Sequence, residues 1–264
     1  VTAETLALDV IEKVGPGVTG LEPGDHVIML WRLSCGTCEF CSASRPALCT
    51  AGTQIRMTGR LLDGSTRFRL DGEEIKHFAG VSCFSEYSVV PAGQVLKIPK
   101  DFSLELATLI GCGVTTGVGA VFNCARVEPG SSVAVFGTGG IGLNIVQAAA
   151  IAGAEKIIAV DLLPNKLAFA ETFGATHTVN SSEGDPVAQI KELTDGGVNY
   201  AFEAVGYPEI LRQAYDATRK MGMTVAVGVT PLDTEISVPV MSLVFEEKTL
   251  TGSVYGSAQP WIEI

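Results

Sequence analysis

The stretch VAVFGTGGIGL (residues 133–143) joins a continuous apolar run to a glycine-rich turn and the start of a helical pattern. Such an apolar run is typical of a strand that is buried on both faces of a parallel sheet. The turn fits G-x-G-x-x-G, with Gly137 for the tight turn, Gly139 for close approach of a pyrophosphate and Gly142 for packing of the helix on the strand. The N–H groups at the start of the helix would face the phosphates. The sequence therefore predicts a dinucleotide-binding α/β unit.

Strand-like and helical patterns alternate from residue 131 onward. Strands are expected at 157–160, 201–205, 224–229 and 249–255, and helices at 140–152, 164–174, 186–193 and 209–220. This alternation predicts a doubly wound parallel sheet.

Asp161 ends the strand that follows the glycine turn. A carboxylate in this position accepts hydrogen bonds from both hydroxyls of an adenosine ribose and repels a 2′-phosphate, so it favours NAD over NADP. No arginine follows within 162–165. Lys166 could approach the ribose or pyrophosphate, or could be a solvated residue on a helix face. The alternative for the whole motif is a glycine turn beside a surface aspartate.

Four cysteines stand close together in LSCGTCEFCSASRPALC (33–49): Cys35, Cys38, Cys41 and Cys49. The spacing C-x2-C-x2-C-x7-C lets four thiolates converge on one tetrahedral ion, which predicts a closed, structural zinc site. The alternative is two disulfides or unpaired thiols. Cysteines spaced two apart pair poorly, and the N-terminus does not resemble a signal peptide.

Residues 1 to about 110 show short strands and turns. Strands are expected at 10–14, 27–30, 67–70 and 88–90, with Asp71-Gly72 as a hairpin turn. This pattern predicts a barrel-like domain that carries the cysteine lobe as an insertion. The charged stretch 67–76 fits a solvated hairpin better than the rim of a substrate entrance.

Composition and charge exclude some classes of partner. The 264 residues are 47% hydrophobic and 18% charged, with a net charge of −11 and a pI near 4.7. No dense basic run appears, so nucleic acid is not expected as a partner. No apolar stretch is expected to be long enough to span a membrane, since the best candidate, 143–154, is interrupted by Asn144 and Gln147 and is too short. Seven cysteines without a signal peptide fit the cytoplasm. The start at Val1 and the apolar ending GSAQPWIEI (256–264) suggest a fragment.

Together these features resemble the zinc-dependent medium-chain alcohol dehydrogenases, close to the class III branch and its bacterial relatives. The resemblance rests on the cysteine lobe and on GPGVTGLEPGDHV (15–27), LLDGSTRFRLDGEEIKHFAGVSCFSEYSVV (61–90), LIGCGVTTGVGAV (109–121), VFGTGGIGL (135–143) and AVDLLPNKL (159–167). It implies a partial GroES-like catalytic domain over 1–114, with the zinc lobe at about 34–50. It also implies an NAD-binding Rossmann domain over 115–264.

The resemblance also assigns site residues. Cys112 matches one cysteine ligand of the family's catalytic zinc, which polarises the alcohol oxygen and stabilises the alkoxide. Thr116 matches a residue beside the nicotinamide, and Ile141 the apolar residue behind its ring. The matching cofactor-binding positions are Gly137, Gly139, Gly140, Gly142, Asp161 and Lys166, with backbone groups of Val227 and Val229 at the carboxamide and Ser253 and Tyr255 at the nicotinamide end.

The chain departs from the family near the catalytic zinc. The family's Gly-His-Glu motif should stand just before Val10, yet residues 3–9 contain no histidine. The histidines present fall elsewhere: His26 in a turn, His77 after the lobe, and His177. The family's first zinc ligand and its proton-relay residue belong upstream, and its closing helix and strands belong downstream. One of three catalytic ligands is thus expected here, so this chain is not expected to hold the catalytic zinc unless other residues complete the site.

Other residues carry weaker expectations. Cys83 and Cys124 are expected in the core, and Glu203 is expected to form hydrogen bonds across the sheet. Arg56 and Arg60 lie near the position where the class III branch recognises the carboxylate of a glutathione adduct, but the loop before Asp63 is arranged differently.

Three functions remain open. The first is NAD-dependent oxidation of primary or aromatic alcohols, or reduction of their aldehydes. The second is a module that binds structural zinc and NAD without turnover. The third is glutathione-dependent formaldehyde oxidation. The resemblance also implies a homodimer or homotetramer formed through the last strand of the cofactor domain.

Overall fold

The computed structural model describes residues 8–257, which form two compact units. The described part of the first unit comprises residues 8–115 together with Ser257, and the second unit comprises Thr116–Gly256. The domain boundary predicted after residue 114 stays a prediction, which limited proteolysis would test. Residues 3–7 of the missing Gly-His-Glu region and residues 258–264 of the apolar ending lie outside the described residues.

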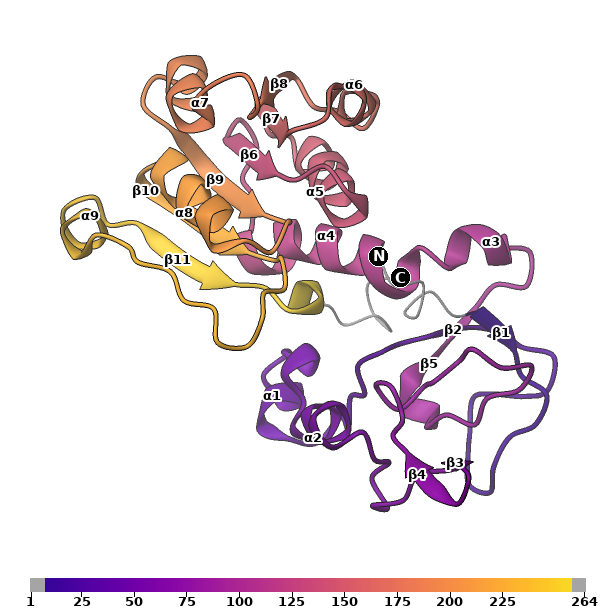
Figure 1. Ribbon diagram of the computed structural model, residues 1–264. Helices are drawn as coiled ribbons and strands as arrows, with labels where there is room; N and C mark the ends of the chain where they lie inside the picture. Colours follow the sequence, from indigo (N-terminus) through magenta and orange to yellow (C-terminus); the bar gives the residue numbers. More distant parts are fainter. Residues whose placement is uncertain (1–7, 258–264) are drawn as a thin grey trace. The chain divides into compact units, whose positions relative to one another are not determined.

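The second unit is built on a six-stranded, all-parallel sheet with the order β11-β10-β9-β6-β7-β8 (Figure 1). Strands β6 and β7 are almost entirely buried, as their continuous apolar runs predict, whereas β9 and β10 are buried mainly in their second halves. The strands are β6 (Ser132–Phe136), β7 (Lys156–Asp161), β8 (His177–Asn180), β9 (Val198–Glu203), β10 (Thr218–Ala226) and β11 (Thr249–Gly252). The predicted doubly wound α/β fold is confirmed.

Helices cover both faces of this sheet. Side chains of α5 and α6 pack with Val133 and Val135 of β6, whereas side chains of α7 and α8 pack with Ala134 and Phe136 of the same strand. Alternate residues of a strand point to opposite faces, so the two helix pairs lie on opposite sides (Figure 1). The α-helices that follow β6 in this unit are α5 (Gly140–Ile151), α6 (Pro164–Thr172), α7 (Pro186–Thr194), α8 (Pro208–Ala217) and α9 (Val240–Phe245).

Some element bounds differ from the sequence prediction. The helix expected to reach residue 220 ends at Ala217, because Thr218 already belongs to β10, where it pairs with Val198 of β9. The pairing is irregular between Thr218 and Met223, and Met221 has a φ of 61°. Residues 218–221 contain no glycine or proline that would mark the end of a helix, so the sequence pattern predicted a helix that continues past Ala217. Strand β8 was not predicted, and β11 is shorter than expected.

The first unit contains a three-stranded antiparallel sheet and a separate hairpin. The sheet has the order β1-β2-β5, formed by β1 (Leu8–Val10), β2 (His26–Met29) and β5 (Val95–Ile98). The hairpin pairs β3 (Phe68–Leu70) with β4 (Glu73–Ile75). Asp71 and Gly72 both have positive φ, 52° and 87°, which confirms the predicted turn. The cysteine lobe adds α1 (Glu39–Ser42) and α2 (Thr50–Thr58).

Three expectations for this unit were wrong. The strand expected at 10–14 is absent beyond its first residue, because β1 ends at Val10. Residues 88–90 form no strand, and Val89 is 69% exposed, so β propensity alone did not bring this segment into a sheet. His26 begins β2 instead of lying in a turn, because Pro23 and Gly24 already complete the turn before it.

One apolar segment is longer than the sequence suggested. Residues Leu104–Ala125 form a continuous helical segment of 22 residues with a mean hydropathy of 1.5, long and apolar enough to cross a membrane by length and composition. It comprises α3 (Leu104–Ala107), α4 (Thr115–Gly119) and π-helical turns at Ile110–Val114 and Ala120–Ala125. The expectation that no stretch is long enough was therefore wrong. However, Ala120, Val121 and Ala125 lie in the core of the second unit, as in the core helix of a folded domain.

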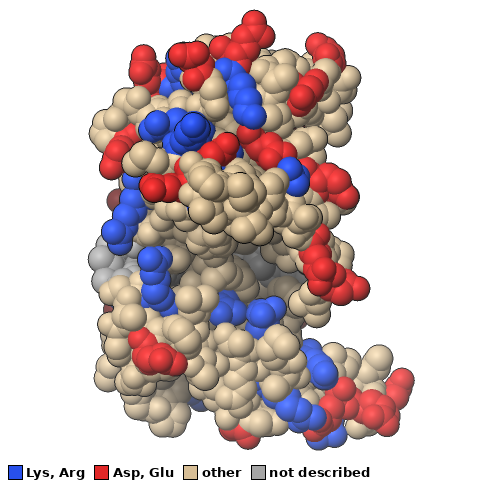
Figure 2. Space-filling view, turned by 90° about the vertical axis from the view of Figure 1, so that its left-hand side faces the viewer, with Lys and Arg blue, Asp and Glu red and all other residues tan. Residues whose placement is uncertain are grey.

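Charged side chains of both signs share the surface. On the face shown in Figure 2, lysine and arginine are interspersed with aspartate and glutamate, and the described residues there form no continuous basic area.

Candidate zinc and cofactor sites

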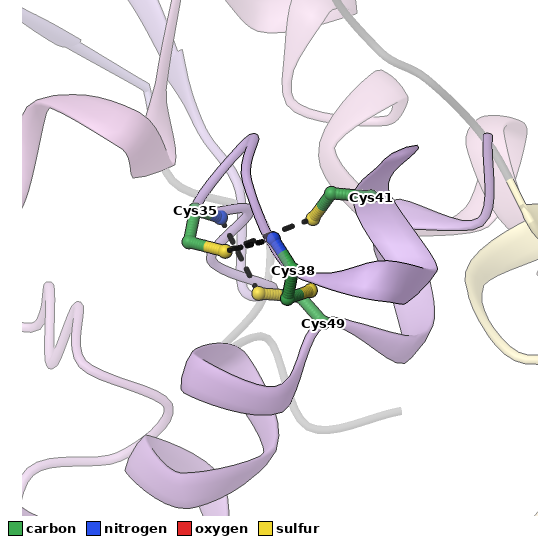
Figure 3. Close-up of side chains that lie close together, drawn as sticks. All are labelled: Cys35, Cys38, Cys41 and Cys49. Carbon is green, nitrogen blue, oxygen red and sulfur yellow. Dashed lines mark hydrogen bonds between the residues drawn. The ribbon is translucent and has the colours of Figure 1, made fainter. Parts of the chain in front are cut away.

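The four lobe cysteines converge in space (Figure 3). Cys35 and Cys38 flank a turn in which Gly36 has a φ of 74°, Cys41 lies on α1, and Cys49 is the residue before α2. Their sulfur atoms all lie within 4.8 Å of one another. A tetrahedral zinc with bonds of about 2.3 Å needs sulfur atoms about 3.8 Å apart, so a small contraction closes the site. The donor set therefore fits a structural zinc with four thiolate ligands, as predicted.

Backbone N–H groups already point at the sulfurs. Cys38 N donates to Cys35 Sγ, and Cys35 N donates to Cys49 Sγ, both at 3.3 Å. Hydrogen bonds from the backbone of Thr37 and Cys38 lower the pKa of Cys35 to about 6, and burial raises the pKa of Cys49 to about 11. One ligand thus loses its proton easily, while the buried ligand needs the metal to displace its proton.

Arg32 lies beneath the lobe and was missed by sequence reasoning. It is 7% exposed, and its Nη2 donates to Ala47 O and to Thr53 Oγ1, the latter at 3.3 Å. Among residues 8–257 no ion pair includes Arg32. Four thiolates around a divalent zinc leave a net charge of −2, so the lobe can balance this buried cation. The available signal was an arginine inside the apolar run that precedes the first cysteine.

Cys112 has different surroundings. It is half-buried on the π-helical turn Ile110–Val114 of the first unit. In the part of the chain that the structure describes, the lobe is the one group of three or more cysteine, histidine or acidic side chains that could share an ion. Catalytic zinc normally takes three protein ligands. The described residues around Cys112 therefore do not fit a catalytic zinc, and the role assigned to Cys112 stays a prediction.

The glycine turn has the geometry of a phosphate-binding loop. Gly137 has a φ of 89°, and its N–H donates to Val160 O at 2.8 Å. A Cβ on Gly142 would lie 1.8 Å from Gly137 O, so only glycine permits this packing of α5 on β6. A Cβ on Gly139 or Gly140 would meet nothing within 4 Å, which leaves the backbone there open to a ligand. No side chain caps α5, so its first N–H groups are available.

Asp161 lies at the end of β7, beside this turn. Its Oδ2 accepts hydrogen bonds from Thr138 N and Thr138 Oγ1, both at 2.9 Å, and Lys166 Nζ lies 4.0 Å away. Burial alone would raise the pKa of Asp161, but the bonds from Thr138 and Leu163 and the charge of Lys166 outweigh it and lower the pKa. The structure thus brings the predicted carboxylate and lysine to the glycine turn. Thr138, which orients the carboxylate, was missed because it occupies the variable position of the motif.

The other predicted cofactor residues lie in the second unit. Thr116 is buried, and Ile141 packs against the core at the start of α5. Val227 follows β10 and is buried, whereas Val229 is 91% exposed. Ser253 and Tyr255 follow β11 and are buried, and Ser253 N donates to Ala226 O at 2.9 Å. Their roles stay predictions.

Comparison with known proteins identifies the relatives of this chain. Residues 7–100 match the alcohol dehydrogenase GroES-like domain, and residues 140–264 match the zinc-binding dehydrogenase family. The class-3 alcohol dehydrogenase of Cereibacter sphaeroides is 43% identical over 260 residues, which cover 95% of this chain and 69% of the relative. The S-(hydroxymethyl)glutathione dehydrogenase of Synechocystis sp. is also 43% identical, over 256 residues, with the same coverage.

Solved structures agree with these relatives. An alcohol dehydrogenase zinc-binding domain protein from Burkholderia ambifaria superposes with a TM-score of 0.91 at 41% identity, covering 97% of this chain and 70% of that one. The benzyl alcohol dehydrogenase of Acinetobacter calcoaceticus superposes with a TM-score of 0.90 at 39% identity, covering 96% and 69%. The predicted combination of a GroES-like domain with a Rossmann sheet is thereby confirmed.

Proposed function

The chain belongs to the zinc-dependent medium-chain alcohol dehydrogenases, and we propose that it transfers hydride between a primary or aromatic alcohol and NAD. In the forward direction, the alcohol and NAD⁺ give the aldehyde, NADH and a proton. The observation that carries the proposal is the open glycine turn with Asp161 oriented beside it. A benzyl alcohol dehydrogenase among the structural neighbours supports an aromatic substrate.

In this proposal the bound dinucleotide supplies the hydride acceptor, and the chain's own residues orient it. The N–H groups after Gly139 hold the pyrophosphate, and Asp161 accepts from the adenosine ribose hydroxyls. Backbone groups of Val227 and Val229 hold the carboxamide. Thr116 and Ile141 flank the nicotinamide ring.

The preference for NAD follows from Asp161. Its lowered pKa keeps it ionised at neutral pH, so it repels the 2′-phosphate of NADP. Replacing Asp161 with asparagine removes this charge. We expect the ratio of the NADP and NAD dissociation constants to fall by about tenfold in Asp161→Asn. An unchanged ratio would contradict this assignment.

The cysteine lobe and Cys112 have separate roles in the proposal. The lobe binds structural zinc, which holds residues 35–49 in place. Cys112 is a candidate ligand of a catalytic zinc, but the described residues do not complete its ligand set.

A second candidate substrate is S-(hydroxymethyl)glutathione, because relatives at 42% and 43% identity are named for it. Arg60 already donates hydrogen bonds to Glu74 Oε2 at 2.5 Å and to Gly64 O at 2.9 Å. Arg56, in contrast, is exposed in the last turn of α2. Arg56 is therefore the better candidate to bind a glutathione carboxylate. If this substrate applies, Arg56→Ala will raise its KM while leaving the KM for benzyl alcohol unchanged.

Formation of NADH tests the proposal in a longer, zinc-loaded version of the protein that carries the family's Gly-His-Glu motif and first zinc ligand, with the 264-residue protein measured beside it. Absorbance at 340 nm is followed with NAD and either benzyl alcohol or S-(hydroxymethyl)glutathione. Turnover of benzyl alcohol supports the leading proposal, and turnover of the glutathione adduct alone favours the second substrate. NADH binding without turnover supports a module that holds zinc and NAD, for which the incomplete surroundings of Cys112 are the supporting observation.

We also propose that the protein is a homodimer or homotetramer in the cytoplasm, without nucleic acid or membrane partners. Strand β11 is paired only with β10 among the described strands, and unpaired sheet edges favour further pairing. Helix α9 nearby exposes Met241 and Phe245 at 65% and 73%. None of the seven cysteines, all within residues 8–257, forms a disulfide. Light scattering of the purified protein tests the assembly.

A further inference from the structure

Glu203 is a buried acidic residue at the carboxyl end of β9. Its side chain is 1% exposed, and its Oε1 accepts hydrogen bonds from Val205 N at 2.7 Å and Gly206 N at 2.6 Å. No ion pair of residues 8–257 includes it. A buried carboxyl group is costly to desolvate, and these two short hydrogen bonds offset part of that cost.

The same residue joins the loops that follow β9 and β10. Its main-chain oxygen accepts from Val227 N at 2.9 Å and from Gly228 N at 3.0 Å. A Cβ on Gly228 would lie 2.3 Å from Gly206 N and 2.7 Å from Glu203 Oε2. The two loops are therefore in close backbone contact beside the carboxyl group.

The loop after β9 also borders the glycine turn. Ala204 N donates to Phe136 O at 2.9 Å, and a Cβ on Gly137 would lie 2.5 Å from Val205 Cγ2. Strand β6 has β7 on one side and β9 on the other, so the strand order reverses between β6 and β9. In doubly wound sheets ligands bind at the carboxyl ends of the strands at such a point. Glu203 thus lies where three ligand-facing loops meet.

We propose that Glu203 is a positioning residue of the cofactor crevice, which fixes the loops after β9 and β10 and places a negative charge that favours the oxidised nicotinamide. This inference rests on the proposed binding of NAD. The nicotinamide ring of NAD⁺ carries a positive charge that NADH lacks, so a nearby carboxylate stabilises NAD⁺ relative to NADH. A glutamine would accept the same two N–H bonds without the charge.

The test compares three ligands on the 264-residue protein by calorimetry: NAD⁺, NADH and ADP-ribose, which lacks the nicotinamide. Glu203→Gln keeps the hydrogen bonds, and we expect it to raise the ratio of the NAD⁺ and NADH dissociation constants at least about threefold. Glu203→Ala releases the loops, and we expect it to weaken both dinucleotides by about tenfold while ADP-ribose binding changes less than twofold. Glu209→Gln, an exposed glutamate at the start of α8, is the control and should change none of these values.

The outcomes separate this inference from the proposed function. If the unmodified protein binds neither NADH nor ADP-ribose, the proposed function and the inference both fail. If it binds them and Glu203→Gln leaves the ratio within the range of Glu209→Gln, the inference alone is overturned. Should Glu203→Ala fail to fold, the isosteric glutamine variant still decides the question. Equal weakening of ADP-ribose and the dinucleotides would show a merely structural role, which also overturns it.

Discussion

The cysteine lobe and the surroundings of Cys112 differ in the sequence separation of the residues that would bind a metal ion. The lobe draws four ligands from the stretch 35–49, and its sulfurs already lie within 4.8 Å of one another. Cys112 lies on a helical segment whose described neighbours complete no such group. A site encoded in one short stretch assembles locally, whereas a site that needs distant segments depends on everything between them.

The lobe is also prepared for its ion in ways that Cys112 is not. Backbone N–H groups donate to Cys35 and Cys49, and the buried Arg32 lies beneath them. These contacts lower the cost of gathering four thiolates in one place. The lobe should therefore control the stability of the first unit, and Cys112 should contribute little to it.

The largest expected effect comes from removing the buried lobe ligand. Cys49 is 0% exposed, and Cys49→Ser should abolish zinc binding and destabilise the first unit by on the order of 5 kcal/mol. The matched variant Cys112→Ser should change stability by less than about 1 kcal/mol. Limited proteolysis locates the effect, with cleavage expected first within residues 8–115. Equal protease sensitivity of the two variants would show that the lobe does not control the stability of the first unit more than Cys112 does.

Substitutions in the glycine turn, a second local motif, should destabilise the second unit less than Cys49→Ser destabilises the first. Gly142→Ala places a Cβ 1.8 Å from Gly137 O, and we expect a loss of about 3 kcal/mol in stability with loss of NADH binding. Gly139→Ala enters open space, so the fold should survive while NADH affinity falls. Thermal unfolding and NADH fluorescence separate the two. Similar unfolding temperatures for both variants would contradict the packing role of Gly142.

Zinc binding to the lobe should depend on pH with a defined sign. The pKa of Cys49 is raised to about 11, so its proton must leave when zinc binds at neutral pH. Between pH 6.5 and 9 the apparent affinity should rise about tenfold or more per pH unit. Because the pKa of Cys35 is about 6, the slope should steepen further below pH 6. Competition with a chromophoric chelator measures it, and a flat profile would show that Cys49 is not a ligand.

The smallest expected effect concerns the cation beneath the lobe. Arg32→Met leaves Ala47 O and Thr53 Oγ1 without their donor and removes the balancing charge. We expect zinc release to a chelator to accelerate about fivefold, which corresponds to roughly 1 kcal/mol. The exposed Arg219→Met is the control. A release rate equal to that of the control would show that Arg32 does not stabilise the zinc-bound lobe.

Much of this architecture follows from local pattern. The cysteine spacing, the glycine turn with Asp161 and the hairpin turn at Asp71 and Gly72 each depend on residues close in sequence, and the structure confirms their geometry. The helix that ends at Ala217 and the missing strand at 88–90 depend on pairing with distant segments, which periodicity does not encode. Thr138, Arg32 and Glu203 acquire their contacts only in the fold.

The number of zinc ions per chain shows whether the lobe alone, or also a site at Cys112, binds metal. The purified 264-residue protein is saturated with zinc, passed through metal-free buffer and analysed by mass spectrometry of the metal content. We expect one zinc per chain, retained in Cys112→Ser and lost in Cys49→Ser. Two zinc ions per chain would contradict this expectation. If one of them is lost in Cys112→Ser, Cys112 belongs to a second complete site.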